Sequence, residues 1–417
     1  MKGKYLLILS FCLLFFVGLC GCTSLLQDPS ADIPPQSLSA PSIKLPSSSG
    51  ERVLYVAFGK QPLLTDLDYR SIAEFEDYQS PSSHFGYPIY SEGLSPEERR
   101  VYSAILYAYD QDLQTILLDD RIFSECALTF TEIFQAVSLD TPLIAQNISL
   151  QSTNLSLSLP GGGTTTATAY TVKEFSSEQK EKKEQAIKKA EDILSLTSHM
   201  ENDLEKAAFF YRYLGEHTVY TTEKEGEPCY LYDALLKGET LCDGFAGAFS
   251  LLCNMADIPC FEKAYFPKES DKVGHTWNCL QIDGRFTNVD ATVSDEVKKN
   301  NPRLKCFGYG DELQEYTPAF LELLPAAHPL EPFDLVFSSI DDPQAPALLE
   351  ERFKANGGRV LVLFEKGDRE MADHYFDLYA RQLSAHCTEG LAYHSYRMAG
   401  KYVCYFYDSP KIENQTR

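Results

Sequence analysis

The sequence predicts an α+β protein in which a cysteine-bearing helix packs on an antiparallel sheet. Cys242 begins an apolar stripe at helical spacing that continues to Ala256, so we expect a helix that ends near Asp257. Asp283-Gly284 separates two strand-like segments and is a strong signal for a two-residue hairpin. Helix and strand signals also alternate on both sides of this core, which predicts flanking small α/β domains.

The region 51–177 is predicted to form an amino-terminal α/β domain that ends in a β-hairpin. Residues 52–58 are expected to form its first strand. Ser95 as an N-cap and Pro96 at the first helical position predict the start of a helix. The other elements predicted here are a helix at 129–138 and a hairpin of strands 148–159 and 164–172.

Two further regions complete the predicted organisation. Residues 178–325 are expected to form the central domain, which begins with helices at 178–197 and 201–217 and then contains the cysteine helix and its hairpin. Residues 326–417 are predicted to form a carboxyl-terminal α/β accessory domain. Its expected elements are strand 333–337, helix 343–355, strand 359–364, helix 368–383 and hairpin 391–407.

The amino terminus has the pattern of a bacterial lipoprotein signal peptide. Two lysines precede an apolar run that is too short to span a bilayer comfortably. The run ends in Leu-Cys-Gly-Cys at positions 19–22, which resembles a lipobox. We therefore expect residues 1–21 to be removed and Cys22 to carry lipid. An ordinary signal peptide and an uncleaved anchor are the alternatives.

The segment that follows is expected to be a tether. Residues 22–50 are rich in serine and proline and cannot bury a core, so we expect them to be disordered. A lipid-anchored protein with such a tether would lie on the extracytoplasmic face of a cell membrane.

The charge of the chain argues against nucleic acid as a partner. The sequence has 37 Lys and Arg residues against 60 Asp and Glu residues, a formal net charge of −23. Phosphate backbones require basic protein surfaces, and so does electrostatic binding to anionic lipid. Membrane contact is therefore expected through the lipid anchor alone.

Three residues between 241 and 292 have the types and spacing that thiol acyl-transfer chemistry requires. Cys242, in the first turn of a helix, is favoured as a thiolate by unpaired N–H groups and the helix dipole. If the hairpin turn has two residues, Trp277 faces Asp290, and His275 and Asp290 lie on one diagonal of the same face. Asp290 could then orient His275, which would take the proton from Cys242. A buried core cysteine and a chance polar face are the alternatives.

The remaining cysteines do not point to a metal site. An even number of them is left outside the cytoplasm, which permits disulfides without specifying their pairing. His275 and Cys279 would lie roughly 13 Å apart along a strand, and no paired short-spaced cysteine motif exists. We expect neither a metal nor another cofactor. The cysteines concerned are Cys126, Cys229, Cys253, Cys260, Cys279, Cys306, Cys387 and Cys404.

Three short motifs surround the predicted triad. They are Cys-Asp-Gly-Phe-Ala at a helix start, Gly-His-Thr-Trp-Asn on one strand and Asn-Val-Asp-Ala-Thr on the next. Together they resemble the bacterial transglutaminase-like domains, which are papain-type thiol enzymes with a Cys-His-Asp triad. The resemblance is specific over 241–292, extends back to about 178, and includes 232–240 as the approach to the cysteine.

The resemblance implies a transglutaminase-like, papain-like core and assigns a role to each residue. Cys242 would be the nucleophile, His275 the general base and acid, and Asp290 the residue that orients the imidazole. Val293 departs from the aromatic residue that many relatives have at this point, which concerns the substrate walls. Such domains act as cross-linking enzymes, deamidases or peptidases, and some have no demonstrated activity.

Two functions follow from the sequence. In the first, the protein is a cell-surface thiol acyltransferase or hydrolase that acts on glutamine side chains or peptide bonds of a protein or peptide substrate. The Cys242 N–H would supply part of an oxyanion hole, with Tyr220 as one candidate for the second donor. In the second, the domain is a non-catalytic scaffold that binds surface proteins, peptides or cell wall. No triad residue is lost, which favours the enzyme and leaves cross-linking, deamidation and hydrolysis open.

Overall fold

The structure is a computed structural model that describes most of the chain beyond the amino-terminal segment. The predicted signal peptide at 1–21, the predicted tether at 22–50, Cys22 and Val293 lie outside the described residues. None of the helices in the described ranges combines the length and the apolarity that a membrane span requires. The described ranges are 54–60, 67–144, 150–158, 164–221, 230–267, 274–292, 306–388 and 390–408.

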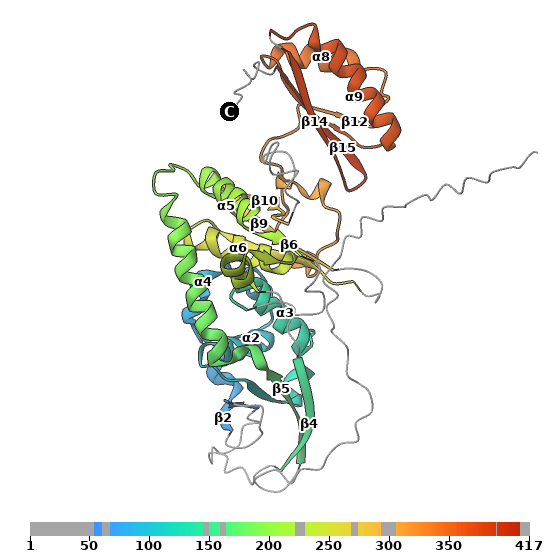
Figure 1. The fold of residues 1–417 in the computed structure, drawn as a ribbon. Helices are drawn as coiled ribbons and strands as arrows, with labels where there is room; N and C mark the ends of the chain where they lie inside the picture. Colours follow the sequence, from blue (N-terminus) through green and yellow to red (C-terminus); the bar gives the residue numbers. More distant parts are fainter. Residues whose placement is uncertain are drawn as a thin grey trace, which may run out of the picture.

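The amino-terminal region is built on a five-stranded antiparallel sheet with strand order β2-β1-β3-β5-β4 (Figure 1). The predicted hairpin is present as β4 and β5, and it extends the sheet because β5 pairs with β3. The sequence did not indicate β3, whose five residues are all buried and therefore lack polar alternation. The strands are β1 (Tyr55–Gly59), β2 (Asp68–Ser71), β3 (Thr115–Asp119), β4 (Leu150–Ser158) and β5 (Thr164–Val172).

Helices α1 (Ile89–Glu92), α2 (Pro96–Asp110) and α3 (Phe130–Asp140) accompany this sheet. The predicted start of α2 is confirmed: the Ser95 hydroxyl accepts from the Glu98 N–H, and the Glu98 carboxylate accepts from the Ser95 N–H. This reciprocal pair is a capping box, which satisfies two amides that the helix itself leaves open.

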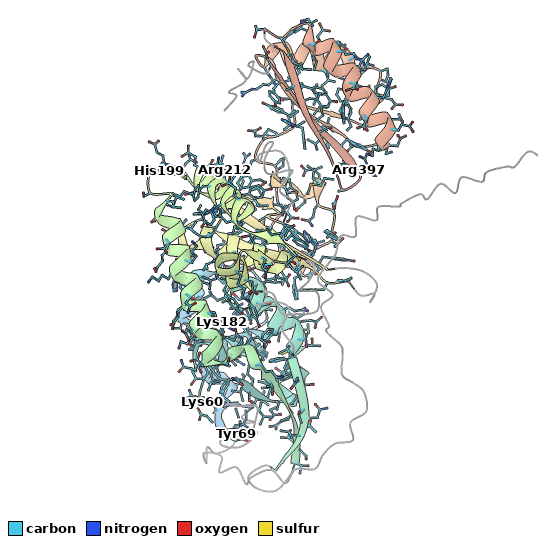
Figure 2. All side chains as sticks on the ribbon, in the orientation of Figure 1. Lys60, Tyr69, Lys182, His199, Arg212 and Arg397 are labelled. Carbon is cyan, nitrogen blue, oxygen red and sulfur yellow. The ribbon has the colours of Figure 1, made fainter. Side chains whose placement is uncertain are left out.

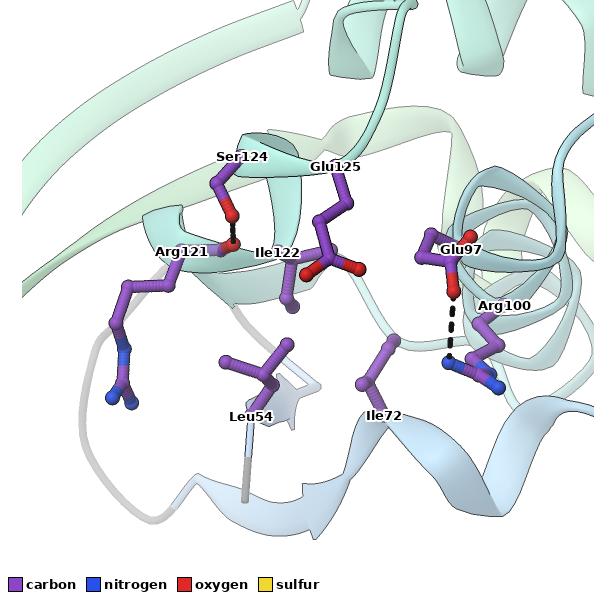
Figure 3. A pocket seen from close by; sticks show the side chains of 8 residues that line it. All are labelled: Leu54, Ile72, Glu97, Arg100, Arg121, Ile122, Ser124 and Glu125. Atoms are coloured by element: carbon purple, nitrogen blue, oxygen red, sulfur yellow. Dashed lines mark hydrogen bonds and ion pairs between the residues drawn. The ribbon is translucent and has the colours of Figure 1, made fainter. Parts of the chain in front are cut away.

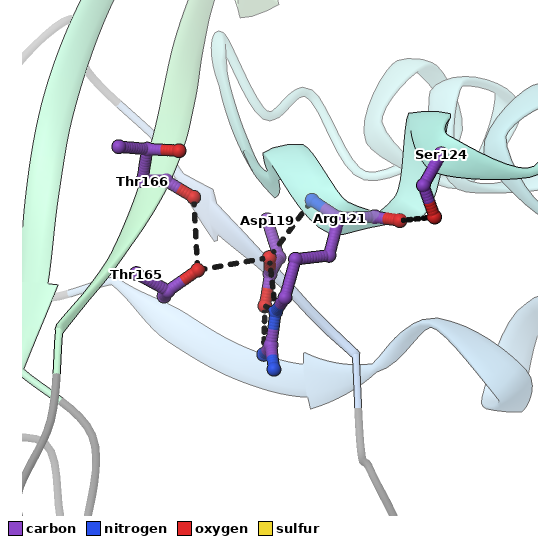
Figure 4. A network of polar contacts seen from close by, with 5 residues as sticks. All are labelled: Asp119, Arg121, Ser124, Thr165 and Thr166. Atoms are coloured by element: carbon purple, nitrogen blue, oxygen red, sulfur yellow. Dashed lines mark hydrogen bonds and ion pairs between the residues drawn. The ribbon is translucent and has the colours of Figure 1, made fainter.

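A polar network joins the short helix η3 (Asp120–Ser124) to the sheet (Figure 4). The buried Asp119 carboxylate at the end of β3 accepts from the Arg121 guanidinium, with Nε at 2.9 Å. The Thr165 hydroxyl of β5 donates to the same carboxylate at 3.4 Å. The Arg121 charge is therefore neutralised within its own segment.

The central region contains a four-stranded antiparallel sheet with order β11-β10-β9-β8, against which α6 packs through β9 and β8. Helix α6 (Cys242–Met255) is buried along nearly all its length. The other helices of this region are α4 (Ser177–Ser195) and α5 (Asp203–His217). The strands are β8 (Cys260–Tyr265), β9 (His275–Ile282), β10 (Arg285–Val289) and β11 (Phe307–Tyr309).

The predicted hairpin register between β9 and β10 is confirmed. Ile282 pairs with Arg285, and the ladder continues in that register to Asn278 and Val289. The two turn residues, Asp283 and Gly284, have φ of 49° and 76°. Positive φ at both positions is what a two-residue turn of this hand requires, and aspartate followed by glycine tolerates it.

The amino-terminal and central regions share one hydrophobic core. A single cluster of buried residues extends from Val56 on β1 through Phe134 on α3 to Phe249 on α6. The hydroxyl of Tyr90, in α1, also donates to the backbone oxygen of Glu262 on β8 at 2.8 Å. The predicted domain boundary at 177 and 178 therefore crosses continuous packing, although the division itself remains a prediction.

The carboxyl-terminal region has a separate four-stranded sheet of order β12-β13-β15-β14, in which β12 and β13 are parallel (Figure 1). Helices α8 (Ala345–Ala355) and α9 (Arg369–Ser384) pack on one face and form its core. Each element predicted here is present. The strands are β12 (Leu335–Phe337), β13 (Arg359–Phe364), β14 (Leu391–Met398) and β15 (Lys401–Asp408).

The other face of this sheet contacts the central region. Leu361, Leu363 and Val403 cluster with Trp277 of β9. Arg397, near the end of β14, lies where the two regions approach each other, and the N–H of Ala399 in the adjacent turn donates to the Glu315 carboxylate at 3.1 Å (Figure 2). The carboxyl-terminal sheet is thus packed against the strand that carries His275.

Candidate active site

Cys242 lies at the first position of α6, where the sequence placed it. The N-cap residue is Leu241, whose side chain has no hydrogen-bond acceptor, so it cannot satisfy the open amides of the first turn. These amides and the helix dipole favour a negative charge on the sulfur. The Cys242 side chain is 0% exposed.

Close packing before the helix determines where Cys242 lies. Strand β7 (Glu239–Thr240) pairs in parallel with β6 (Val219–Tyr220) immediately ahead of α6. A Cβ on Gly244 would lie 2.0 Å from Thr240 Oγ1 and 2.8 Å from the Tyr230 backbone oxygen. Only glycine fits there, so the chain ahead of the helix approaches the first turn of α6 closely.

His275 and Asp290 lie together at the open end of the hairpin. The His275 Nε2 is 2.7 Å from Asp290 Oδ2, and since a carboxylate only accepts, Nε2 carries the proton. The second carboxylate oxygen accepts from the Thr292 N–H at 3.0 Å and from the Thr292 hydroxyl at 2.5 Å. The Asp290 carboxylate is therefore bonded through both oxygens, which orients the imidazole.

The charges of the pair stabilise each other. Burial lowers the pKa of His275, but the Asp290 carboxylate and a hydrogen bond with Cys242 outweigh it and raise that pKa well above its ordinary value. Burial raises the pKa of Asp290, but His275 and Thr292 outweigh it and lower that pKa. The structure thus brings Cys242, His275 and Asp290 together, with the imidazole between the thiol group and the carboxylate.

A fourth buried residue, Asp243, lies beside the sulfur, and the sequence did not single it out. Its Oδ1 accepts from the Thr276 hydroxyl at 2.7 Å and lies 3.7 Å from Cys242 Sγ. Burial first, and then the Cys242 thiolate, raise the pKa of this carboxyl to about 8. In sequence, an aspartate in a first helical turn indicates only a favourable dipole interaction with solvent-exposed amides.

An aromatic wall borders His275. The Trp277 ring is parallel to the imidazole at 5.8 Å between centroids, and Tyr316 lies at 5.1 Å, tilted by 42°. Tyr316 also stacks on Tyr265 of β8 at 5.3 Å. These rings restrict the imidazole and exclude water from one side of it. Tyr316 comes from a segment without regular structure, so no periodicity could have indicated it.

Tyr220 and the remaining cysteines complete the sequence-predicted set. Tyr220 packs against Leu241 and Cys242, and its role as an oxyanion donor stays a prediction. Cys229 lies outside the described residues, and the described cysteines are all free thiols. Within the described ranges, no group of three or more His, Cys, Asp or Glu side chains is arranged to hold a metal ion.

A separate cavity of about 440 Å³ lies in the amino-terminal region (Figure 3). Its walls include Arg100 and Arg121, but both cations are paired within the protein, Arg100 with Glu76 at 2.9 Å and Arg121 with Asp119. The lining belongs to elements other than α6, β9 and β10. The cavity is therefore not part of the triad site.

Comparison with known proteins gives short or weak similarities. No family model matches the chain. A stretch of 113 residues is 27% identical to the human kyphoscoliosis peptidase and covers 24% of this chain and 17% of that protein. The mouse kyphoscoliosis peptidase is 26% identical over the same length, with the same coverage. The chain thus spans less than a fifth of the length of the curated relatives it matches.

Two solved structures are similar over about a third of the chain. A TGase matches 34% of this chain and 44% of its own, with 15% identity and a TM-score of 0.23. The periplasmic domain of TgpA from Pseudomonas aeruginosa bound to ethylmercury matches 34% and 61%, with 17% identity and a TM-score of 0.21. The structure itself confirms the predicted mixed helix and sheet class.

Proposed function

We propose that the protein is a cell-surface thiol acyltransferase or hydrolase of the transglutaminase-like type. The observation that supports this proposal is the hydrogen bond of 2.7 Å between His275 and Asp290. His275 lies on β9, which packs against α6, the helix that begins with Cys242. An oriented imidazole beside a thiol at the positive end of a helix is the arrangement that thiol acyl transfer requires. Part of the chain is similar to proteins named as peptidases, which agrees with this chemistry.

The reaction would proceed through a thioester on Cys242. The thiolate attacks the carbonyl carbon of a glutamine side chain or peptide bond, and the Cys242 N–H stabilises the oxyanion. His275 gives its proton to the leaving nitrogen, so that ammonia or an amine departs and the thioester forms. His275 then takes a proton from an incoming amine or water, whose nitrogen or oxygen attacks the thioester carbonyl carbon. The C–S bond breaks, and the Cys242 thiolate and the protonated His275 are restored. An amine acceptor gives cross-linking, and water gives deamidation or hydrolysis.

The alternative is a non-catalytic scaffold that binds surface proteins, peptides or cell wall. One observation favours it: Cys242 is 0% exposed, so no substrate carbon can reach the sulfur in this conformation. The enzyme therefore requires a conformation in which the sulfur is uncovered, whereas the scaffold does not.

The rate at which iodoacetamide labels Cys242 separates the two functions. At mildly acidic pH, ordinary thiols with a pKa of about 8.5 are protonated and react slowly. If the protein is a thiol enzyme, Cys242 should label fastest, His275→Ala should slow this labelling, and Asp290→Ala should slow it less. Cys126 and Cys387, which are partly exposed, serve as internal controls. Labelling of Cys242 that is no faster than that of Cys126 and Cys387, with no response to His275→Ala, would favour the scaffold.

Lipid anchoring at Cys22 is proposed from the lipobox-like motif alone. Cys22→Ala is expected to release the protein from the membrane fraction or to leave an unprocessed precursor. Fractionation and gel mobility measure this. A variant that partitions and migrates like the unmodified protein would contradict the anchor and, with it, the cell-surface location.

A further inference from the structure

We propose that Asp243 is a positioning residue of the active site: its carboxyl joins the helix that carries Cys242 to the strand that carries His275. The inference rests on the proposed function, because it concerns the same thiol and imidazole. Asp243 follows Cys242 in α6, and Thr276 follows His275 in β9. The hydrogen bond between Asp243 and Thr276 therefore holds Cys242 and His275 in position relative to each other.

The contacts of Asp243 are directed at the site. A single oxygen, Oδ1, accepts from the Thr276 hydroxyl at 2.7 Å and lies 3.7 Å from Cys242 Sγ. Asp243 is 8% exposed and Thr276 is 3% exposed, so water does not compete strongly for this bond. Burying these polar groups costs free energy in desolvation, and the hydrogen bond between them offsets part of that cost.

A second bond between the same two elements provides a comparison. The Asn278 side-chain amide donates to the Ala246 backbone oxygen at 2.9 Å. Asn278 is 0% exposed, so this bond is as buried as the Asp243–Thr276 bond. It joins α6 to β9 further from their starts, where neither partner is next to a reacting residue. Loss of the Asn278 bond should therefore loosen the packing without moving the thiol relative to the imidazole.

The Asp243 carboxyl can lie beside Cys242 because it does not repel the thiolate electrostatically. Burial is the main cause of the raised pKa of the Asp243 carboxyl, which is about 8. The titratable groups that also act on this carboxyl are Cys242 on the same helix, which raises the pKa, and His275 on β9, which lowers it. At neutral pH the carboxyl is mostly protonated and adds no negative charge beside the sulfur. An ionised carboxylate there would raise the pKa of Cys242 and reduce the thiolate fraction.

The test measures iodoacetamide labelling of Cys242 in the intact protein from about pH 5 to pH 9, a range that includes imidazole and thiol titration. Asp243→Ala and Thr276→Val both remove the bond and are expected to slow labelling at pH 6 by about tenfold, the effect of one pKa unit. Asp243→Asn keeps a neutral acceptor and Thr276→Ser keeps the hydroxyl, so both should label at the original rate.

Asn278→Ala is the matched control. It is expected to lower the melting temperature while leaving the pH midpoint of labelling unchanged, because its bond does not involve a neighbour of Cys242 or His275. Melting curves of all variants establish that each is folded at the labelling temperature.

The outcomes separate the inference from the proposed function. If Cys242 labels no faster than Cys126 in the unmodified protein, the proposed function fails and the inference fails with it. If Cys242 is fast but Asp243→Ala and Thr276→Val leave its rate unchanged, only the inference is overturned. It is also overturned if Asn278→Ala shifts the midpoint equally, or if Asp243→Asn labels as slowly as Asp243→Ala.

Discussion

The central and carboxyl-terminal sheets both have four strands and a hairpin, yet they bury different side chains. The central sheet buries Lys263, Asn278 and Asn288, and Asp243 and Thr276 are buried between it and α6. Among the described residues of β12–β15, no polar or charged residue is buried. Burying polar groups costs free energy unless each finds a partner, so the central sheet gives up stability for positioned polar groups. The carboxyl-terminal sheet, in contrast, has a core of aliphatic and aromatic side chains.

The largest expected difference between the two regions concerns two buried cysteines. Cys242 begins α6 of the central region, and Cys404 lies on β15 of the carboxyl-terminal region; both are 0% exposed. Cys242→Ala should lower turnover of glutaminyl peptides by roughly 10⁴-fold or more, because a triad without its nucleophile retains little activity. Cys404→Ala should keep full turnover and lose about 1 kcal/mol of stability through a small cavity. Ammonia release, peptide cleavage and melting curves measure these effects. Turnover that survives in Cys242→Ala would contradict the assignment.

The contact between the two sheets can be tested through Trp277, the single tryptophan of the chain. Leu363 faces Trp277, whereas its neighbour Val362 faces the helices α8 and α9. Leu363→Ala should cost about 2–4 kcal/mol and shift the Trp277 fluorescence to longer wavelength as water gains access. Val362→Ala should lower stability without that shift. Identical spectra in the two variants would argue against the contact.

The pH dependence of stability should differ between buried and exposed aspartates. In the unfolded chain Asp243 ionises above its ordinary pKa, whereas in the folded protein it keeps its proton up to about pH 8. Unfolding therefore releases a proton in this range, and the contribution of Asp243 to stability falls as pH rises toward 8. Asp243→Asn should thus raise the free energy of unfolding at pH 7 by up to about 4 kcal/mol, and by nothing at pH 3.

The control for Asp243 lies on α9 of the carboxyl-terminal region. Asp377 is exposed and accepts from the Tyr393 hydroxyl at 2.9 Å. Asp377→Asn should change stability by less than about 0.5 kcal/mol at either pH. Denaturant titrations at both pH values measure the difference. A gain for Asp243→Asn that persists at pH 3 would show that the effect is not electrostatic.

The smallest expected effects come from two lysines. Lys263 is 1% exposed and donates to Asn288 at 3.1 Å and to Asp311 at 3.3 Å, whereas Lys401 pairs with Glu365 at 3.8 Å near the surface. Lys263→Met should cost roughly 2 kcal/mol because it leaves the buried Asn288 side-chain oxygen unpaired. Lys401→Met should cost less than about 0.5 kcal/mol, as is usual for an exposed pair. Urea unfolding measures both losses of stability. Equal losses in the two variants would contradict the expected difference between the buried and the exposed lysine.

Local signals in the sequence account for much of the predicted site. The start of α6 at Cys242 follows from a loop signal and a helical stripe, and the His275–Asp290 diagonal follows from a two-residue turn that determines the register. Neither signal extends beyond some fifteen residues of chain, which is why a pattern of neighbours was sufficient.

The sequence by itself determined the mixed helix and sheet class, the longer helices and the hairpins of each region, and the register that places His275 near Asp290, because these depend on periodicity and turn chemistry within short segments. Only the tertiary structure decided the sheet orders, the core shared across residue 177, and the contact of Leu363 with Trp277. It also decided the state of Asp243, whose proton depends on burial under a strand that begins more than thirty residues later. Burial and long-range pairing arise when distant segments meet, and no local pattern of residues encodes them.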